Sequence, residues 1–103
     1  MMTEEQKVQA KIRNYLQAAG FIVIKIIVAS TSGEPDLIAC GPDGRFWAVE
    51  VKTETGRLTK LQEAKLNLLA KNGARAFVAY GYADFLKKFE AATNKSTGHV
   101  PGL

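Results

Sequence analysis

The sequence contains one cysteine, one histidine and three prolines among its 103 residues. A lone cysteine, Cys40, cannot form a disulfide within the chain, which excludes a disulfide scaffold and fits a reducing cytoplasm. The single histidine, His99, has no ligand partners nearby in the sequence, and no zinc-finger spacing is present. Softer metals therefore have no ligand set in this chain.

Long hydrophobic runs are also absent. No apolar stretch is long enough to cross a bilayer, and the first residues are polar and charged where a secretory signal needs an apolar segment. The composition, 47% hydrophobic, suffices for one modest core. We therefore expect a soluble cytoplasmic protein with no membrane partner. It should form a single domain over 1–103, with its core at 4–92 and a flexible polar tail at 93–103.

Helical and strand patterns alternate along the chain. Two capping-box patterns, Thr3 with Gln6 and Thr59 with Gln62, each precede apolar residues at helical intervals. β-Branched and aromatic runs between turn signals predict strands. In chain order, the sequence predicts a helix over 3–19, strands over 21–29, 37–40 and 46–51, a helix from 59 to near 73, a strand over 76–80 and a helix over 83–92. This order predicts an α/β fold with a mixed sheet between helices.

Two short motifs flank the predicted hairpin: Gly-Glu-Pro-Asp at 33–36 and Glu-Val-Lys at 50–52. A symmetric hairpin closed by the turn at 41–44 would place Cys40 opposite Arg45 and Asp36 opposite Val49. Because side chains alternate along a strand, Glu50 and Lys52 share one face. In that symmetric hairpin, Asp36 joins them only if the register shifts by one residue or the strand contains a bulge.

Two carboxylates on neighbouring strands would suit a hard divalent cation. Mg²⁺ and Mn²⁺ prefer oxygen ligands and take one or two protein carboxylates beside substrate phosphate. The alternative is an ordinary polar pair, Glu50 with Lys52, on a solvated strand face. The apolar residues around Glu50 weigh against that alternative, since an ionised side chain in a buried strand is costly unless it is paired or bound to metal.

Four elements in this order resemble a known family: Glu5 on the first helix, the motif at 33–36, the motif at 50–52, and Gly-Arg-Leu-Thr-x-x-Gln at 56–62. Over roughly residues 4–82 the chain is similar to the VRR-NUC (virus-type replication-repair nuclease) branch of the PD-(D/E)xK nuclease superfamily. The resemblance implies a restriction-endonuclease-like αβββαβ core with a mixed central sheet flanked by helices, plus a C-terminal helix. Glu34 departs from the pattern, because the family more often has an apolar residue there.

The resemblance also implies a Mg²⁺- or Mn²⁺-dependent endodeoxyribonuclease with one or two ions per site. Asp36, Glu50 and the carbonyl group of Val51 would bind the metal, and Lys52 would orient the attacking water or stabilise the transition state. Glu5 would bind a second ion directly or through water, although Glu4 competes for that role. Gln62 would steady the lysine or the water. The structural alternative for Glu5 is a favourable acidic residue in a first helical turn, and for Gln62 it is capping alone.

The chain has a net charge of +4, and its basic excess lies in the second half. Arg57, Thr59, Lys60 and Lys65, at and near the start of the second helix, are predicted to contact DNA phosphates. A solvated helix face is the alternative for each lysine.

Sequence-specific restriction is disfavoured, because the chain has no appended recognition domain. The resemblance suggests branched DNA as the substrate, such as a Holliday junction, cut by a homodimer. The final helix around Phe85 and Phe89 and the apolar first strand are candidate dimer surfaces, with core packing as the alternative. Two other functions remain open: cleavage of flaps, nicks or single-stranded ends, and a non-catalytic DNA-binding module.

Overall fold

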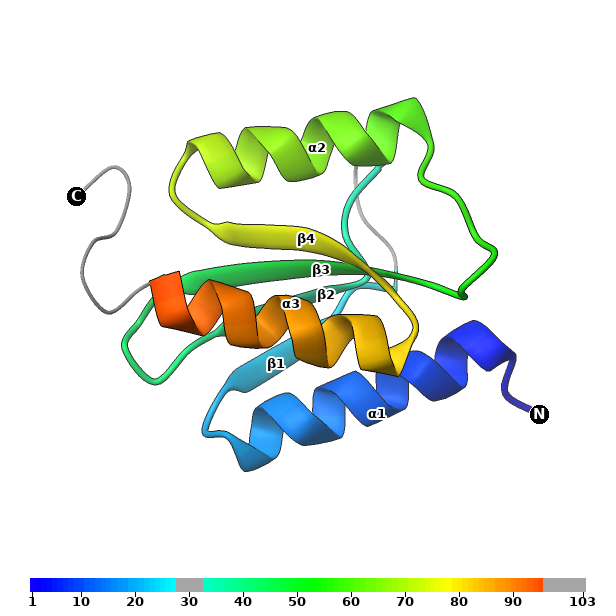
Figure 1. Ribbon diagram of the computed structural model, residues 1–103, viewed down its shortest axis with the longest axis horizontal. Coiled ribbons are helices and arrows are strands. Elements are labelled where there is room, and N and C mark those ends of the chain that lie inside the picture. Colours follow the sequence, from blue (N-terminus) through cyan, green and yellow to red (C-terminus); the bar gives the residue numbers. More distant parts are fainter. Residues whose placement is uncertain (28–32, 96–103) are drawn as a thin grey trace.

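The computed structural model describes residues 1–27 and 33–95. Helices and strands follow the predicted order (Figure 1). The elements are α1 (Glu4–Ala18), β1 (Ile22–Lys25), β2 (Leu37–Cys40), β3 (Phe46–Lys52), α2 (Lys60–Lys71), β4 (Arg75–Tyr80) and α3 (Tyr82–Lys95). Both predicted capping boxes are present, at Thr3 with Gln6 and at Thr59 with Gln62.

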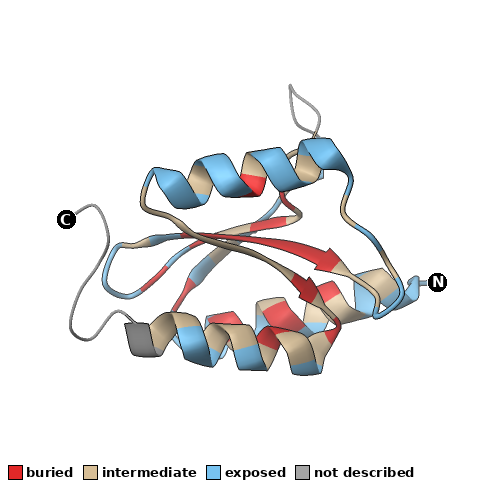
Figure 2. Ribbon diagram, turned by 45° about the horizontal axis from the view of Figure 1, so that its top comes forward, coloured by how far each residue is buried: buried red, intermediate tan, exposed pale blue. Residues whose placement is uncertain are grey.

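The four strands form one mixed sheet in the order β1-β2-β3-β4. The pairs β1–β2 and β2–β3 are antiparallel, whereas β3 and β4 are parallel and connected through α2. Helices α1 and α3 cover one face of the sheet and α2 covers part of the other (Figure 2). The predicted mixed sheet between helices, with a restriction-endonuclease-like αβββαβ order and an additional C-terminal helix, is confirmed.

The main core lies between the sheet and the pair α1 and α3. Trp47, Val49 and Val51 alternate along β3 and point into this core. The intervening side chains of β3, including Glu50, therefore point to the face that carries α2. Phe85 is fully buried and Phe89 packs against the same core, so core packing accounts for both phenylalanines of the last helix.

The hairpin between β2 and β3 has a longer loop than the symmetric four-residue turn. Cys40 pairs with Phe46, and Leu37 pairs with Val49, so the expected pairing of Cys40 with Arg45 is wrong. The loop spans 41–45 and is closed by Gly41 N–H, which donates to the carbonyl oxygen of Arg45 (2.9 Å). This one-residue shift places Asp36 next to Glu50 across the two strands.

Other differences lie at element ends. The first strand is shorter than the predicted 21–29, and its last two predicted positions lie outside the described residues. The last helix continues through positions 93–95, which were expected to begin the tail, and 96–103, with His99, lie outside the described residues. In the described part of the chain, no helix combines the length and apolar character needed to traverse a bilayer.

Replacing Phe85 with alanine should remove the centre of an aromatic cluster. Its ring lies 5.7 Å from the ring of Tyr15 and 5.6 Å from that of Phe89, measured between centroids. The cavity should lower the free energy of unfolding by about 3–5 kcal/mol in urea denaturation. Leu68→Ala is the matched control, since Leu68 on α2 is 54% exposed and should change stability by less than about 1 kcal/mol. Equal losses in the two variants would contradict this description of the core.

Candidate active site

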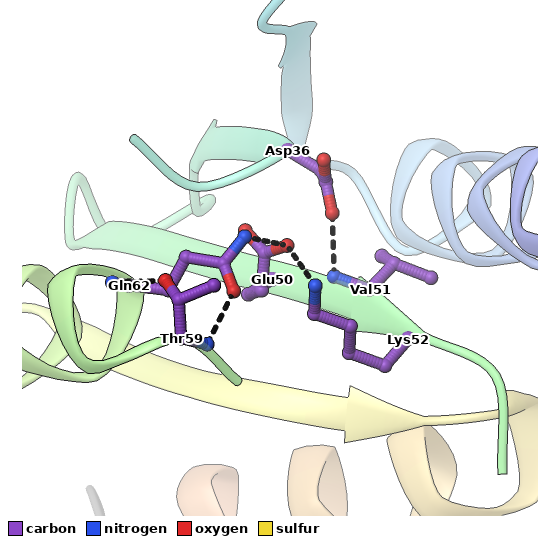
Figure 3. A network of polar contacts seen from close by, with 6 residues as sticks. All are labelled: Asp36, Glu50, Val51, Lys52, Thr59 and Gln62. Atoms are coloured by element: carbon purple, nitrogen blue, oxygen red, sulfur yellow. Dashed lines mark hydrogen bonds and ion pairs between the residues drawn. The ribbon is translucent and has the colours of Figure 1, made fainter. Parts of the chain in front are cut away.

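Asp36 lies directly before β2, and its side chain accepts a hydrogen bond from the main chain of β3. Pro35 before it has no N–H group, and the pairing of β2 with β3 begins one residue later, at Leu37. The Asp36 main-chain oxygen still accepts a hydrogen bond from Ile26 N–H (2.8 Å). Its side-chain Oδ2 accepts one from Val51 N–H (2.7 Å), which fixes the carboxylate against β3 (Figure 3).

Glu50 projects from the centre of β3 toward α2 and is only 3% exposed. Its Oε2 accepts a hydrogen bond from Gln62 Nε2 (3.2 Å) and lies 3.6 Å from Lys52 Nζ. Its other oxygen, Oε1, is buried and has no hydrogen-bond partner among the described residues. Figure 3 shows Glu50, Lys52 and Gln62 gathered on one side of β3, with Asp36 beside them.

The surroundings of Glu50 disfavour its ionised form. Burial, followed by the negative charge of the nearby Asp36, raises the pKa of Glu50 to about 8. Lys52 lowers the pKa of Glu50, and Glu5 raises it slightly. Negative charges on both Asp36 and Glu50 would therefore repel each other, and a cation bound between the two carboxyl groups would reduce this repulsion.

Gln62 combines the two roles that the sequence left open. Its side-chain oxygen accepts a hydrogen bond from Thr59 N–H (2.9 Å) and completes the cap of α2. Its amide nitrogen donates to Glu50 at the same time. One side chain therefore joins the start of α2 to the buried carboxylate.

The structure distinguishes Glu5 from Glu4. Glu4 has a side chain that is 77% exposed and forms an ion pair with Lys7 (3.3 Å). Glu5 is half-buried, and its charge acts on Glu50. Among the described residues, however, no three carboxylate, histidine or cysteine side chains form a metal-binding group, so Glu5 does not complete a triad with the other two carboxylates.

Gln9 was not selected from the sequence. It lies one turn after Glu5 on α1, is 6% exposed, and its side-chain oxygen has no hydrogen-bond partner in the described part of the chain. The available signal was its spacing, because Gln9 precedes Ile12 and Leu16 on the face of α1 that points into the core.

The four predicted DNA-contacting residues lie at or near the start of α2, but their side chains differ in exposure and in ion pairing. Arg57, Thr59 and Lys60 are exposed. Lys65 instead forms an ion pair with Glu34 (2.8 Å between Nζ and Oε1). The family-atypical Glu34 thus links the segment before Asp36 to α2.

Asp36 and Glu50 fit a hard divalent cation chemically. They supply two carboxylates, and the unpaired buried Oε1 of Glu50 is an oxygen that lacks a partner. A site with two carboxylates leaves coordination positions for water and substrate oxygens, which is how Mg²⁺ is commonly held. The raised pKa of Glu50 also fits a metal site, because a bound cation would favour the ionised form of this carboxylate.

Solved structures similar to this chain share its fold. One, described as a VRR_NUC domain, is 32% identical, with a TM-score of 0.78 over 86% of this chain and 97% of the other. A second, a VRR_NUC domain protein, is 20% identical, with a TM-score of 0.69 over 88% of each chain. Hjc, a Holliday junction resolvase from the archaeal hyperthermophile Archaeoglobus fulgidus, is 27% identical, with a TM-score of 0.57 over 74% of this chain and 67% of its own.

No curated protein matches the chain. The sequence profile of the VRR-NUC domain matches residues 3–83, which is most of the chain and includes both acidic motifs and the capped start of α2. This chain therefore belongs to the VRR-NUC domain family.

Proposed function

We propose that this protein is a metal-dependent, structure-selective DNA endonuclease that hydrolyses phosphodiester bonds in branched DNA such as a Holliday junction. The observation that carries the proposal is the meeting of Asp36, Glu50 and Lys52 at one end of β3. Family membership supports a nuclease, and the similarity to a Holliday junction resolvase supports branched DNA as the substrate.

The proposed metal ligands are Asp36, Glu50 and the carbonyl oxygen of Val51. Glu5 is the proposed contact to a second ion, through water, since it lies outside a three-carboxylate group in the described residues. The ions that suit these oxygen ligands are Mg²⁺ and Mn²⁺, with one or two per site. When bound, such an ion supplies Lewis-acid charge beside the scissile phosphate and makes water easier to deprotonate.

Lys52 supplies the positive charge that belongs to the chain itself. Its side chain is 15% exposed and its ammonium group lies 3.6 Å from Glu50. In this position Lys52 orients the attacking water and stabilises negative charge that develops on the phosphate. Gln62 acts as a positioning residue, because its hydrogen bond fixes Glu50 and its cap fixes α2.

The capped start of α2 is the proposed contact for a neighbouring DNA phosphate. Arg57, Thr59 and Lys60 are exposed there, and main-chain N–H groups at a helix start favour anions. Lys65 can join them only by exchanging Glu34 for a phosphate. We therefore assign Lys65 a smaller share of DNA binding than Arg57 or Lys60.

The decisive experiment incubates the purified protein with Mg²⁺ or Mn²⁺ and a labelled immobile four-way junction. Asp36→Asn, Glu50→Gln and Lys52→Ala should each lower the cleavage rate by about a hundredfold or more, because each removes charge that acts on the transition state. DNA binding should remain. Glu90→Gln, a charge change at an exposed position of α3, is the matched control and should cleave normally. Undiminished wild-type cleavage in excess chelator would refute the metal dependence.

Flap, nicked, single-stranded and linear duplex substrates tested in parallel determine the substrate class. Paired symmetric nicks in the junction, with little cleavage of the linear duplex, are the expected result. Preferred cleavage of flaps or single-stranded ends would reassign the substrate while leaving the nuclease chemistry in place.

The raised pKa of Glu50 predicts an unusual pH dependence of stability without metal. The folded protein should hold a proton on Glu50 up to about pH 8, whereas the unfolded chain loses it near the ordinary value of 4.5. Since the folded state binds the extra proton between these values, the free energy of unfolding should fall as pH rises through this interval.

Glu50→Gln should remove that loss, and in chelator the variant should be more stable than the wild type at pH 9, with a smaller difference at pH 5. Urea denaturation at several pH values measures this difference, with Glu90→Gln as the control. Parallel pH profiles for wild type and Glu50→Gln would contradict the burial of an ionisable Glu50.

We also propose that the protein acts as a homodimer through the part of the sheet that α2 leaves bare. Val23 points into the core, so Ile22 and Ile24 point to the other face, where they are 70% and 55% exposed. Ile22, Cys40 and Phe46 form one row across β1, β2 and β3. A contiguous exposed apolar face of this kind suits a self-complementary contact, and a two-fold dimer would present two active sites to a symmetric junction.

The double variant Ile22→Lys/Ile24→Lys should convert this dimer to a monomer, because it places charge in an apolar contact. Light scattering coupled to size-exclusion chromatography measures the mass. Leu68→Lys on α2, which replaces a side chain that is 54% exposed, controls for the loss of surface hydrophobicity. A wild-type protein that is monomeric at tens of micromolar would exclude the dimer.

A further inference from the structure

A hollow of about 650 Å³ lies at the end of β3 that carries Lys52, between α1, the chain that follows β3 and the start of α3. Figure 1 shows these three segments close together at one end of the molecule. The walls of the hollow include Lys11 of α1, Thr53 and Glu54 after β3, and Tyr82 at the start of α3. The volume lies within the range of about 300–1,000 Å³ that is usual for small-molecule sites.

The hollow adjoins the proposed active site through neighbours in the chain. Thr53 directly follows Lys52, whose carbonyl oxygen accepts a hydrogen bond from Gly81 N–H (2.9 Å). Gly81 also lines the hollow, as does Glu4, which directly precedes Glu5. A DNA strand whose scissile phosphate lies at Lys52 can therefore place a neighbouring nucleotide in the hollow.

Two of the charged groups that line the hollow are available to a ligand. Glu4 and Lys7 form an ion pair with each other (3.3 Å). Lys11 and Glu54 are exposed, and neither forms an ion pair or a hydrogen bond in the described part of the chain. One cation on α1 and one anion after β3 thus remain. A nucleotide suits this combination, because its phosphate is an anion and its base can donate hydrogen bonds.

Tyr82 presents a face of its ring to the hollow. Lys11 Nζ lies over this ring, 5.7 Å from its centroid, and both residues line the hollow. The ring is held in place by Phe85, with centroids 6.2 Å apart and planes inclined by 20°, and by the edge of the Tyr15 ring. Stacking of a nucleobase on an aromatic ring is stronger than a cation–π contact at an exposed site. A base can therefore displace the ammonium group of Lys11 from this ring.

Glu54 supplies a hydrogen-bond acceptor beside Tyr82. A Cβ at Gly81, the residue before Tyr82, would lie 3.3 Å from Glu54 Cγ and 3.7 Å from its Oε2. The carboxylate thus lies against the main chain that leads into Tyr82. An ionised carboxylate accepts hydrogen bonds and donates none, so it favours a base with an exocyclic amino group, such as cytosine or adenine.

We propose that this hollow binds one unpaired nucleotide of the cleaved DNA strand, next to the scissile phosphate. The base would stack on Tyr82, its amino group would donate to Glu54, and Lys11 would contact the phosphate of this nucleotide. A fully paired duplex must unstack a base to fill the hollow, whereas a branch, flap or single-stranded end does so at lower cost. The hollow would thereby select opened DNA. The position of the scissile phosphate rests on the proposed nuclease function.

Binding of single-stranded decamers without metal tests the hollow in the non-cleaving Glu50→Gln parent. Tyr82→Leu should weaken binding about tenfold because it removes the stacking face, whereas Tyr82→Phe keeps the ring and should stay within about twofold of the parent. Lys11→Gln should reduce the slope of log affinity against log salt by about 0.7, the value for one phosphate contact on a single strand. Lys87→Gln, an equal charge change at an exposed position of α3 outside the hollow, should leave the slope unchanged.

The base preference of the parent tests Glu54. Cytosine and thymine have rings of the same size, but only cytosine carries an exocyclic amino group, so oligo(dC) should bind more tightly than oligo(dT). Glu54→Gln should bring the ratio of the two affinities to about one, since an amide can also donate to the carbonyl oxygen of thymine. Tyr82→Leu should instead weaken the binding of both.

Oligo(dC) should also shift the ring-proton resonances of Tyr82 in NMR spectra of the parent. This measurement needs no substitution at Tyr82, which matters because its ring packs against the core. Circular dichroism checks that each variant is folded.

Unshifted Tyr82 resonances, equal decamer affinities in the parent and Tyr82→Leu, or equal binding of oligo(dC) and oligo(dT) by the parent would each overturn the proposal. An effect of Lys11→Gln alone would do the same, because it would leave a phosphate contact without a bound base. Failure of the wild type to cleave any substrate would refute the nuclease function without changing these affinities.

Discussion

The carboxylate of Glu50, buried at the centre of β3 beside Asp36, is the constraint on which the rest of the site depends. A carboxyl group in this position is costly when ionised, and among the described residues only Lys52 and Gln62 are its direct partners. A cation bound beside Asp36 and Glu50 would offset this cost by stabilising the ionised carboxylate. A buried ionisable group with a strongly raised pKa is typical of functional centres.

Tertiary contacts hold the two sides of the site together. Gln62 belongs to the cap of α2 and also contacts Glu50, so the helix start and the strand centre share one side chain. On the other side, a Cβ at Gly33 would lie 2.8 Å from Leu61 Cγ, so only glycine allows this close approach to α2. The ion pair between Glu34 and Lys65 joins the same two segments. Helix α2 therefore positions both Asp36 and Glu50.

Local sequence signals sufficed to predict the element order and both capped helices, and the two acidic motifs contain the carboxyl groups that the structure brings together. The hairpin register could not be derived, because turn residues at 41–44 are compatible with loops of four or five residues and only packing selects between them. The ends of the first strand and the last helix were displaced for a similar reason, since tertiary contacts extend or shorten elements beyond their local signals. The contact of Glu34 with Lys65 joins residues distant in sequence, for which local periodicity carries no signal.

The Glu34–Lys65 ion pair has a mechanical consequence. Lys65 cannot give its full charge to a carboxylate and to an incoming polyanion at once, so any negatively charged partner that attracts Lys65 competes with Glu34 for it. Such competition would weaken the ion pair that links α2 to the segment before Asp36. Tight binding of a polyanion at α2 therefore opposes rigid positioning of Asp36 beside Glu50. Ionic strength sets the balance between the two.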